Sequence, residues 1–426
     1  MLTRQTLMRM VLLGLLTIVL IASTQGFAKV VIFQGWVRNS FPEFAAQLEK
    51  KFETMYPDID LQFRDLSYED TFRQLVLNCT AGNPPDLAYV DPSMLPKLYE
   101  IGAIDDITPY LTPKLVENMM MKDAHTIKGV LVAACWNPTP YAFFTNKTLL
   151  NKAGYNKAPQ SISEVAEVAR KVAALGTTES GAKIWGLCIA GKRDIHLSYL
   201  FAPWLFNFGG KFLDTSGKAV INSPEAIACF KWFKELYDYD GALGPTPIDR
   251  ETPRYMFVRN ELAMQGEGPW QRGLYRRLSG QGEAFDDNYW VTPYPGQTPG
   301  QWGKSITYAQ SLTIPKGAKH KEEAKLLLQF LLSDQEIVEL RFKLDTMIPG
   351  QVDMAQQEVY QDPYTQTFIK QSLLGGKVPY AEHAENSATL FSLFGQAWED
   401  IIIGNADIKT RLEQLAREFN IANGEI

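Results

Sequence analysis

Residues 261–273 join a large aromatic ring to a tight turn, in the order Glu-Leu-Ala-Met-Gln-Gly-Glu-Gly-Pro-Trp-Gln-Arg-Gly. Residues 262–264 predict a short buried strand, and the two glycines that follow permit a turn. Pro269 has the fixed φ of a first helical position, so Trp270 would lie just inside a helix, beside unpaired N–H groups. Such a ring can offer a ligand a flat apolar face, although a Trp that plugs the core under a loop has the same signature.

Other aromatic and polar residues fall at the ends of predicted elements. Sugars present apolar C–H faces and rims of hydroxyls, so they stack on rings while carboxylates and amides bind the hydroxyls. This pattern favours a sugar site, but each ring taken alone also fits core packing. The candidates are Trp36, Tyr68, Asp91, Trp136, Tyr199, Trp204, Trp270 and Tyr308.

Motifs for catalysis and for metal binding are weak. The sequence holds neither a Gly-x-Ser-x-Gly elbow nor a His-Glu-x-x-His motif, and the spacing of its four histidines suits no metal site. Residues 186–192 are spaced like a phosphate loop, but Arg193 follows where a Ser or Thr belongs. We therefore expect no cofactor, no metal and no catalytic residue. Two carboxylates that cleave a glycoside could come from anywhere in the fold, so a secreted glycoside-acting enzyme stays an alternative.

Length and charge limit the classes of protein further. A chain of 426 residues predicts two domains, and a net charge of −6 without a basic stripe argues against nucleic acid as a partner. The four cysteines lie far apart in apolar stretches, which fits buried free thiols as well as any of three disulfide pairings. They are Cys79, Cys135, Cys188 and Cys229.

Residues 1–28 have the pattern of a signal peptide. A basic start precedes the apolar run 11–22, and Gly-Phe-Ala ends at Ala28, which predicts cleavage before Lys29. The run is shorter than the roughly 20 apolar residues of a membrane span, although an uncleaved anchor is the alternative. No cysteine precedes Cys79, so no lipid is expected at the cleavage point. We expect a soluble periplasmic protein.

The first third of the chain alternates strands and helices, which predicts a doubly wound α/β lobe. In such lobes ligands bind beyond the carboxyl ends of the strands, where Trp36 and Asp91 fall. The expected elements are strand 29–36, helix 41–55, strand 59–63, helix 68–80 and strand 86–90.

Three extended segments bounded by proline or glycine predict crossings between two lobes, at residues 136–141, 291–294 and 348–350. Both lobes would then be discontinuous, with 29–138 and 294–347 in the N-terminal lobe and 139–293 and 348–426 in the C-terminal lobe. The second lobe should be α/β as well. Its expected elements are helices 163–175 and 224–237, strand 184–189 and a helical tail over 396–420.

The order and spacing of several short motifs resemble family-one extracellular solute-binding proteins, the group that includes maltose-binding protein. The motifs span nearly all of the expected mature chain. They are Phe-Glu-Thr-Met-Tyr-Pro-Asp-Ile at 52–59, Ala-Gly-Asn-Pro-Pro-Asp at 81–86, Gly-Ala-Ile-Asp-Asp-Ile-Thr-Pro at 102–109, Glu-Leu-Ala-Met with Gly-Pro-Trp at 261–270, and Ile-Pro-Lys-Gly-Ala-Lys-His-Lys-Glu-Glu-Ala at 314–324.

This resemblance implies a periplasmic-binding-protein fold of type II, in which two discontinuous α/β lobes are joined by a hinge. It implies a monomer without enzymatic activity that closes on a carbohydrate in the interlobe cleft and delivers it to the membrane permease of an ABC importer. A glycerol phosphodiester or another small polar solute is the alternative ligand.

The resemblance also suggests roles for individual residues. Trp270 resembles the family's stacking tryptophan, Tyr199 a cleft tyrosine and Asp91 a hydroxyl-binding aspartate. Two further places belong to this expected ligand site. Phe391 falls near another stacking position, and Trp36 and Arg38 occupy the first strand-to-helix loop, where members of the family differ.

Overall fold

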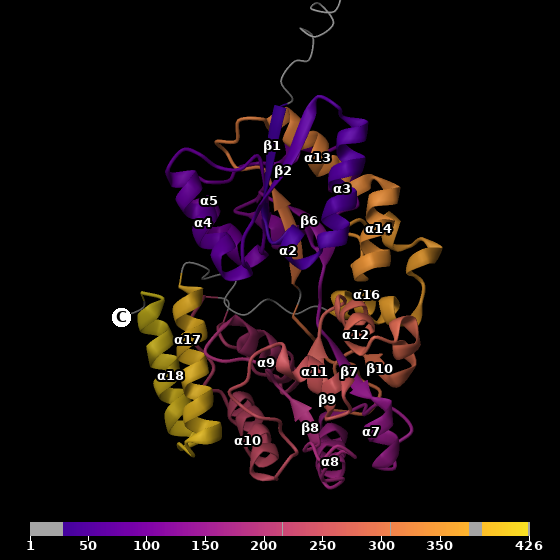
Figure 1. The fold of residues 1–426 in the computed structure, drawn as a ribbon. Coiled ribbons are helices and arrows are strands. Elements are labelled where there is room, and N and C mark those ends of the chain that lie inside the picture. Colours follow the sequence, from indigo (N-terminus) through magenta and orange to yellow (C-terminus); the bar gives the residue numbers. More distant parts are fainter. Residues whose placement is uncertain (1–28, 215, 307, 375–385, 425–426) are drawn as a thin grey trace, which may run out of the picture.

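The computed structural model describes residues 29–214, 216–306, 308–374 and 386–424. The expected signal peptide, residues 1–28, lies outside the described residues. The described chain forms two main sheets, each with its own hydrophobic core and its own covering helices (Figure 1). Within the described residues, no helix has the length and the apolar character that crossing a membrane requires.

The first sheet is mostly built from the N-terminal part of the chain, in the strand order β2-β1-β3-β11-β6. Strand β1 is parallel to β2 and β3, whereas β11 returns from far along the chain and is antiparallel to β3 and β6. The predicted alternation is observed in β1 (Lys29–Gly35), α3 (Pro42–Met55), β2 (Ile59–Asp65), α4 (Tyr68–Thr80) and β3 (Leu87–Val90). The sheet is completed by β6 (Ala134–Pro138) and β11 (Ala309–Thr313), which lie outside that predicted stretch.

The second sheet has the strand order β10-β7-β9-β8. Every residue of β7 and of β9 is buried, because helices cover both faces of these central strands. Its elements are β7 (Ala142–Asn146), α8 (Ile162–Ala173), β8 (Trp185–Cys188), α9 (Ile195–Asn207), α10 (Pro224–Asp238), β9 (Leu262–Glu267), β10 (Tyr289–Thr292), α17 (Ser387–Trp398) and α18 (Ile408–Ala422).

The remaining elements include α13 (Lys321–Ser333), which packs in the first core, and shorter helices and connecting segments. The other α-helices among them are α2 (Val37–Ser40), α5 (Leu95–Glu100), α6 (Pro113–Glu117), α7 (Lys147–Lys152), α11 (Thr252–Val258), α12 (Gln271–Ser279), α14 (Gln335–Asp345), α15 (Val352–Ala355) and α16 (Pro363–Leu374). A small hairpin pairs β4 (Thr126–Ile127) with β5 (Val130–Leu131). Short 3-10 helices are η1 (Pro92–Met94), η2 (Thr108–Tyr110), η3 (Lys122–His125), η4 (Gly282–Asn288) and η5 (Glu358–Tyr360).

The C-terminal tail, expected to be helical over 396–420, is helical with a break in it. Helix α17 ends at Trp398, a π-helical turn covers Glu399–Ile403, and α18 begins only at Ile408. Asn405 adopts a left-handed φ of 57°, which stops the helix. Asp407 then caps α18 by accepting a hydrogen bond from the Thr410 amide at 2.9 Å.

Three connections between the sheets are held together where they pass one another. The amide of Thr139 donates to the carbonyl of Tyr308 at 2.7 Å. The side-chain amide of Asn137 donates to the carbonyl of Ile348 at 2.8 Å. These contacts make a bundle of three strand-like segments.

The second connection lies later in the chain than the sequence indicated. Val291 pairs with Phe144 in the second sheet, and Tyr294 is fully buried in the second core. The chain enters the first sheet only at Ala309, next to Pro138. The expected crossing at 291–294 is therefore misplaced, because its prolines follow an edge strand rather than a link between lobes.

Candidate functional site

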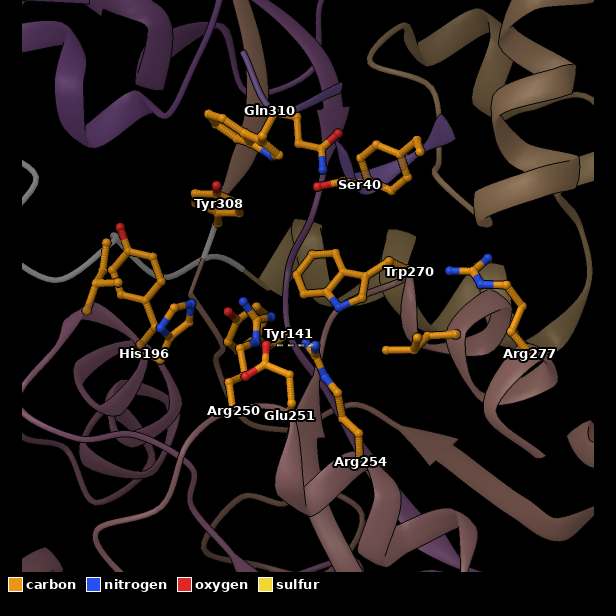
Figure 2. Close-up of a pocket in the computed structure, with 15 residues that line it drawn as sticks. Ser40, Tyr141, His196, Arg250, Glu251, Arg254, Trp270, Arg277, Tyr308 and Gln310 are labelled. Atoms are coloured by element: carbon orange, nitrogen blue, oxygen red, sulfur yellow. Dashed lines mark ion pairs between the residues drawn. The ribbon is translucent and has the colours of Figure 1, made fainter. Parts of the chain in front are cut away.

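A cavity of about 370 Å³ is lined by residues from both sheets and their helices (Figure 2). This volume is within the range of small-molecule sites. Residues 36–41 and 308–310 contribute the wall on the side of the first sheet: Trp36, Ser40, Phe41, Tyr308 and Gln310. The other wall consists of Tyr141, Ile195, His196, Tyr199, Arg250, Glu251, Arg254, Trp270, Leu274 and Arg277.

Trp270 projects its half-buried ring into this cavity from the turn between β9 and α12 (Figure 2). It is the N-cap residue of α12, with φ −61° and ψ −15°. The ring of Tyr141 meets it edge-on, with 5.8 Å between ring centroids and an angle of 79°. The preceding carbonyl, of Pro269, accepts hydrogen bonds from Thr346 Oγ1 at 2.5 Å and from Tyr364 OH at 2.9 Å. The backbone before Trp270 is thus held by two hydrogen bonds, and Tyr141 packs against the ring itself.

The glycines of this turn have a different role from the predicted one. Gly266 lies in strand β9, opposite Phe143, and neither it nor Gly268 has a positive φ. A Cβ atom at Gly268 would overlap the ring of Trp270, which folds back over this residue. The glycine is therefore required for space rather than for backbone freedom.

A buried ion cluster lies beside Trp270. Glu267, the last residue of β9, accepts hydrogen bonds from Arg254 Nε at 2.7 Å and Nη2 at 3.3 Å, and from Arg250 Nη2 at 3.3 Å. Burial alone would raise the pKa of Glu267, but the charges and hydrogen bonds of Arg254 and Arg250 lower it to about 2. The cluster therefore combines two guanidinium groups with one carboxylate.

The sequence analysis missed this cluster. Arg254 lies in α11 and Arg250 just before it, and only the fold brings them to the end of β9. The one available signal was Glu267, a charged residue directly after an apolar strand and next to Trp270.

On the opposite wall, Gln310 is held by a buried arginine. Arg341 is 2% exposed; its Nη2 donates to Gln310 Oε1 at 3.0 Å, and its Nη1 to Asp345 Oδ2 at 2.9 Å. The ring of Phe41 lies 3.5 Å from Arg341 Cζ. Because the arginine occupies the amide oxygen, the amide nitrogen of Gln310 points toward the cavity as a donor (Figure 2).

The placement of Gln310 depends on an irregularity in β11. The register with β6 shifts between Gln310 and Ser311. Ser311 then contacts buried His125, with 2.7 Å between Oγ and Nε2, while Gln310 faces the cavity. Bulges often redirect side chains in this way next to sites, and neither the bulge nor the distant Arg341 can be recognised from sequence alone.

Four of the predicted site residues line the cavity: Trp36, Tyr199, Trp270 and Tyr308. The ring of Trp36 stacks on Tyr89 with 3.7 Å between centroids. Tyr199 and Tyr308 approach each other at 5.8 Å. Tyr89, which does not line the cavity, supports the ring of Trp36, and Tyr199 and Tyr308 support each other at the cavity surface.

The other predicted site residues lie elsewhere. Trp136 belongs to the first core, against Phe33 and Phe44, and Trp204 to the second core, stacked on Trp232 at 5.0 Å between centroids. Both are core residues in this structure because they lie on buried elements that face inward.

Three further predicted residues stand apart from the lining as well. Arg38 is exposed, pairs with Glu49 and lies over Phe63, and Asp91 is fully buried with Oδ1 2.7 Å from the Ser93 amide. Phe391 is buried behind Tyr199, with 6.0 Å between centroids. The side chain of Tyr68 lies outside the described residues.

The titratable groups of the described chain include no candidate metal cluster of three or more His, Cys, Asp or Glu. The four cysteines are free thiols in this structure, as one of the two sequence interpretations held. Burial raises the pKa of the Cys79 thiol to about 11 and, with a further contribution from Asp249, that of Cys188 to about 12. The thiols are therefore neutral and unreactive near neutral pH.

Comparison with known protein families adds independent evidence. The family described as bacterial extracellular solute-binding protein matches residues 35–337. A binding protein of Brucella abortus (strain 2308) is 26% identical over 313 residues, which cover 70% of this chain and 72% of the relative.

Solved structures resemble the fold along almost its whole length. An ABC transporter solute-binding protein from Thermotoga lettingae TMO, bound with α-D-tagatose, superimposes with a TM-score of 0.80 at 21% identity, covering 93% of this chain and 99% of its own. MalE3 of T. maritima, bound to maltose, superimposes with a TM-score of 0.76 at 22% identity, covering 92% and 100%. At these identities the likeness shows the fold alone.

Proposed function

Because this chain belongs to the family of bacterial extracellular solute-binding proteins, we propose that it captures a carbohydrate in the cavity between its two sheets and delivers it to an ABC permease. The family predicted from short motifs is confirmed, and so is the predicted fold class, an α/β protein of the periplasmic-binding-protein type II. The ligand and the residues that bind it form the proposal.

The observation that carries this proposal is the half-buried ring of Trp270 in a cavity that also holds polar side chains. Its ring offers an apolar face, while Arg250, Gln310 and Tyr199 surround the same space with hydrogen-bonding groups. A sugar has both kinds of surface, so this mixture suits it better than a purely apolar or purely ionic ligand. The two similar structures described above hold tagatose and maltose, which are sugars of different length.

Binding without catalysis is part of the proposal. Among the described lining residues, Glu251 is the one carboxylic acid. Hydrolysis of a glycosidic bond needs two carboxyl groups that flank the bond, roughly 5 to 9 Å apart. The functional event is instead closure of two lobes around the ligand, and contacts that exist only in the closed state supply its free energy. The three connections near Asn137, Tyr308 and Ile348 form the hinge, and the protein acts as a monomer.

Export completes the proposed function. The family is extracellular, which supports reading residues 1–28 as a signal peptide. We expect the exported protein to begin at Lys29 and to carry no acyl chain. Mass spectrometry of the secreted protein measures both, and an intact N-terminus or an added lipid mass would overturn this part of the proposal.

A thermal-shift screen of mono- and oligosaccharides tests the function. A ligand at 100 times its Kd stabilises the folded state by about 2.7 kcal/mol, which raises the melting midpoint measurably. We expect at least one sugar to do so, and calorimetry should then give one site per chain. If no sugar shifts the midpoint while a peptide or an amino acid does, the carbohydrate assignment fails.

A further inference from the structure

We infer that the sugar bound in this cavity carries an acidic group, a carboxylate or a phosphate, and that Arg250 receives it. This inference rests on the proposed function and narrows its ligand class.

Arg250 and Arg254 share the single carboxylate of Glu267, and they share it unequally. Arg254 forms the closer contact, through Nε at 2.7 Å and Nη2 at 3.3 Å, whereas Arg250 makes one hydrogen bond at 3.3 Å. Arg254 also lies 3.8 Å from Glu251. The negative charge of Glu267 therefore mainly compensates that of Arg254, and the positive charge of Arg250 is only partly compensated.

Arg250 retains hydrogen-bonding capacity at the cavity. A guanidinium has five N–H donors, of which the structure pairs one, and Nε of Arg250 is buried with no hydrogen-bond partner among the described residues. Its Cζ lies 5.0 Å from the ring centroid of Trp270 and 5.8 Å from that of Tyr141. A sugar stacked on Trp270 would therefore have this cation at the edge of its ring.

The other charges near the cavity do not supply the missing anion. Glu251 lines the wall, but its side chain is 66% exposed and it lies next to Arg254. Asp345 lies between Arg341, at 2.9 Å, and Arg277, at 4.0 Å, so it too serves two arginines.

A further carboxylate, Asp91, does not line the cavity. It is fully buried and accepts the Ser93 amide, on the side of Tyr199 and Tyr308. The surface offered to a ligand is consequently rich in donors: Arg250, Arg254, Arg277 and the amide nitrogen of Gln310.

A donor-rich wall of this kind selects for a ligand rich in acceptors. Guanidinium binds carboxylate and phosphate in a bidentate manner, with charge-assisted hydrogen bonds about twice as strong as neutral ones. A neutral sugar would offer the unpaired donors of Arg250 hydroxyl partners only. An acidic sugar uses the same stacking face and adds the charge that the cluster lacks.

Matched pairs of ligands test the inference by titration calorimetry. Two pairs compare a neutral sugar with its carboxylate: glucose with glucuronate, and galactose with galacturonate. Each of these is used as a monosaccharide and as a short oligosaccharide. A third pair compares glucose with glucose 6-phosphate. We expect an acidic member to bind at least tenfold more tightly than its neutral partner, with an advantage that shrinks as salt is added. The carboxylate and phosphate pairs show which acid is preferred.

Arg250→Gln is the decisive variant, because Glu267 keeps its closer partner Arg254 and the fold should persist. It should reduce binding of the acidic member at least tenfold and leave the neutral member within about threefold. Arg259→Gln is the matched control: Arg259 is the C-cap residue of α11, the helix that begins two residues after Arg250. It pairs with Glu261 at 2.9 Å and does not line the cavity.

Three outcomes would overturn the inference, and each refutes a different part of it. If neutral members bind as tightly as acidic ones, the acidic ligand is refuted while sugar binding stands. If the acidic preference survives in Arg250→Gln with an unchanged melting midpoint, the assignment to Arg250 is refuted. If no acidic or neutral sugar binds, the proposed function itself fails and this inference fails with it.

Discussion

Glu267 shows how single residues obtain their properties from partners that are distant in the sequence. Its carboxylate is buried at the end of β9, and without the two arginines its charge would be too costly to keep there. With them, its pKa falls to about 2, and Arg254 is held at the cavity wall. This residue therefore supports one wall of the cavity without lining it.

Glu267→Gln should destabilise the protein at neutral pH by about 3 kcal/mol, because it leaves two arginines next to an uncharged side chain. The folded-state pKa of Glu267 is below the ordinary value of about 4.3, so its stabilisation is present above that pH and is lost as the pH falls toward 2. Urea unfolding of both proteins between pH 7 and pH 2 should show the difference shrinking over this window. A difference that stays constant would contradict the ion cluster.

The individual site residues were predictable only in part. Trp270 and Tyr199, which a motif surrounds, and Trp36, which follows a strand, were candidates from the sequence and do line the cavity. Arg250 and Gln310 could not, since their roles depend on partners 17 and 31 positions away. Trp204 was indistinguishable from a cleft residue, because core and cleft tryptophans differ only in what packs around them.

At the scale of elements, the turn between β9 and α12 determines where the aromatic platform stands. The ring of Trp270 occupies the space above Gly268, and the carbonyl of Pro269 is fixed by Thr346 and Tyr364. Thr346 directly follows α14, a helix that packs with the first core. The platform is therefore attached to both halves of the molecule.

Gly268→Ala should displace the indole and weaken sugar binding about tenfold or more, because a Cβ would overlap the ring. Gly280→Ala is the control at the other end of α12, where φ is 68° and no atom lies within 4 Å of the added carbon. It should lower stability by about 1 kcal/mol through backbone strain and leave affinity unchanged. Calorimetry and urea unfolding measure both effects. Equal affinity in the two variants would contradict the described ring position.

Elements with a strong hydrophobic period were predictable, and those set by turn chemistry were not. Strand β1 and helices α3 and α8 lie close to their expected bounds because their apolar spacing is regular. The break before α18 depends on the left-handed Asn405 and on the cap at Asp407. Neither feature can be predicted from the spacing of the apolar residues in the tail. The bulge in β11 likewise leaves no periodic signal.

At the scale of the whole molecule, the three connections determine how the two halves can move. Gly350 lies directly against the backbone of β6, where a Cβ would overlap the carbonyl oxygen of Cys135. The sequence indicated discontinuous lobes from its extended segments, but it placed the second connection too early, because prolines at 293 and 295 mark an edge of the second sheet.

Gly350→Ala should therefore separate the third connection from the first and cost about 1 to 3 kcal/mol of folding stability. The backbone atoms of Cys135 and Trp136 that it meets cannot rotate away as a side chain could. Urea unfolding measures the loss. An unchanged midpoint would mean that the connections are not packed together as described.

The affinity of Trp270→Ala for the sugar identified by screening decides whether the indole is a stacking platform. Removing a stacking face should reduce affinity about ten- to hundredfold, since ring stacking contributes roughly 0.5 to 1.5 kcal/mol beyond the buried apolar area. The half-buried ring should contribute less to folding than the 3 to 5 kcal/mol typical of a core tryptophan. A variant that is strongly destabilised yet binds the sugar normally when folded would show that Trp270 is a core residue and not a sugar platform.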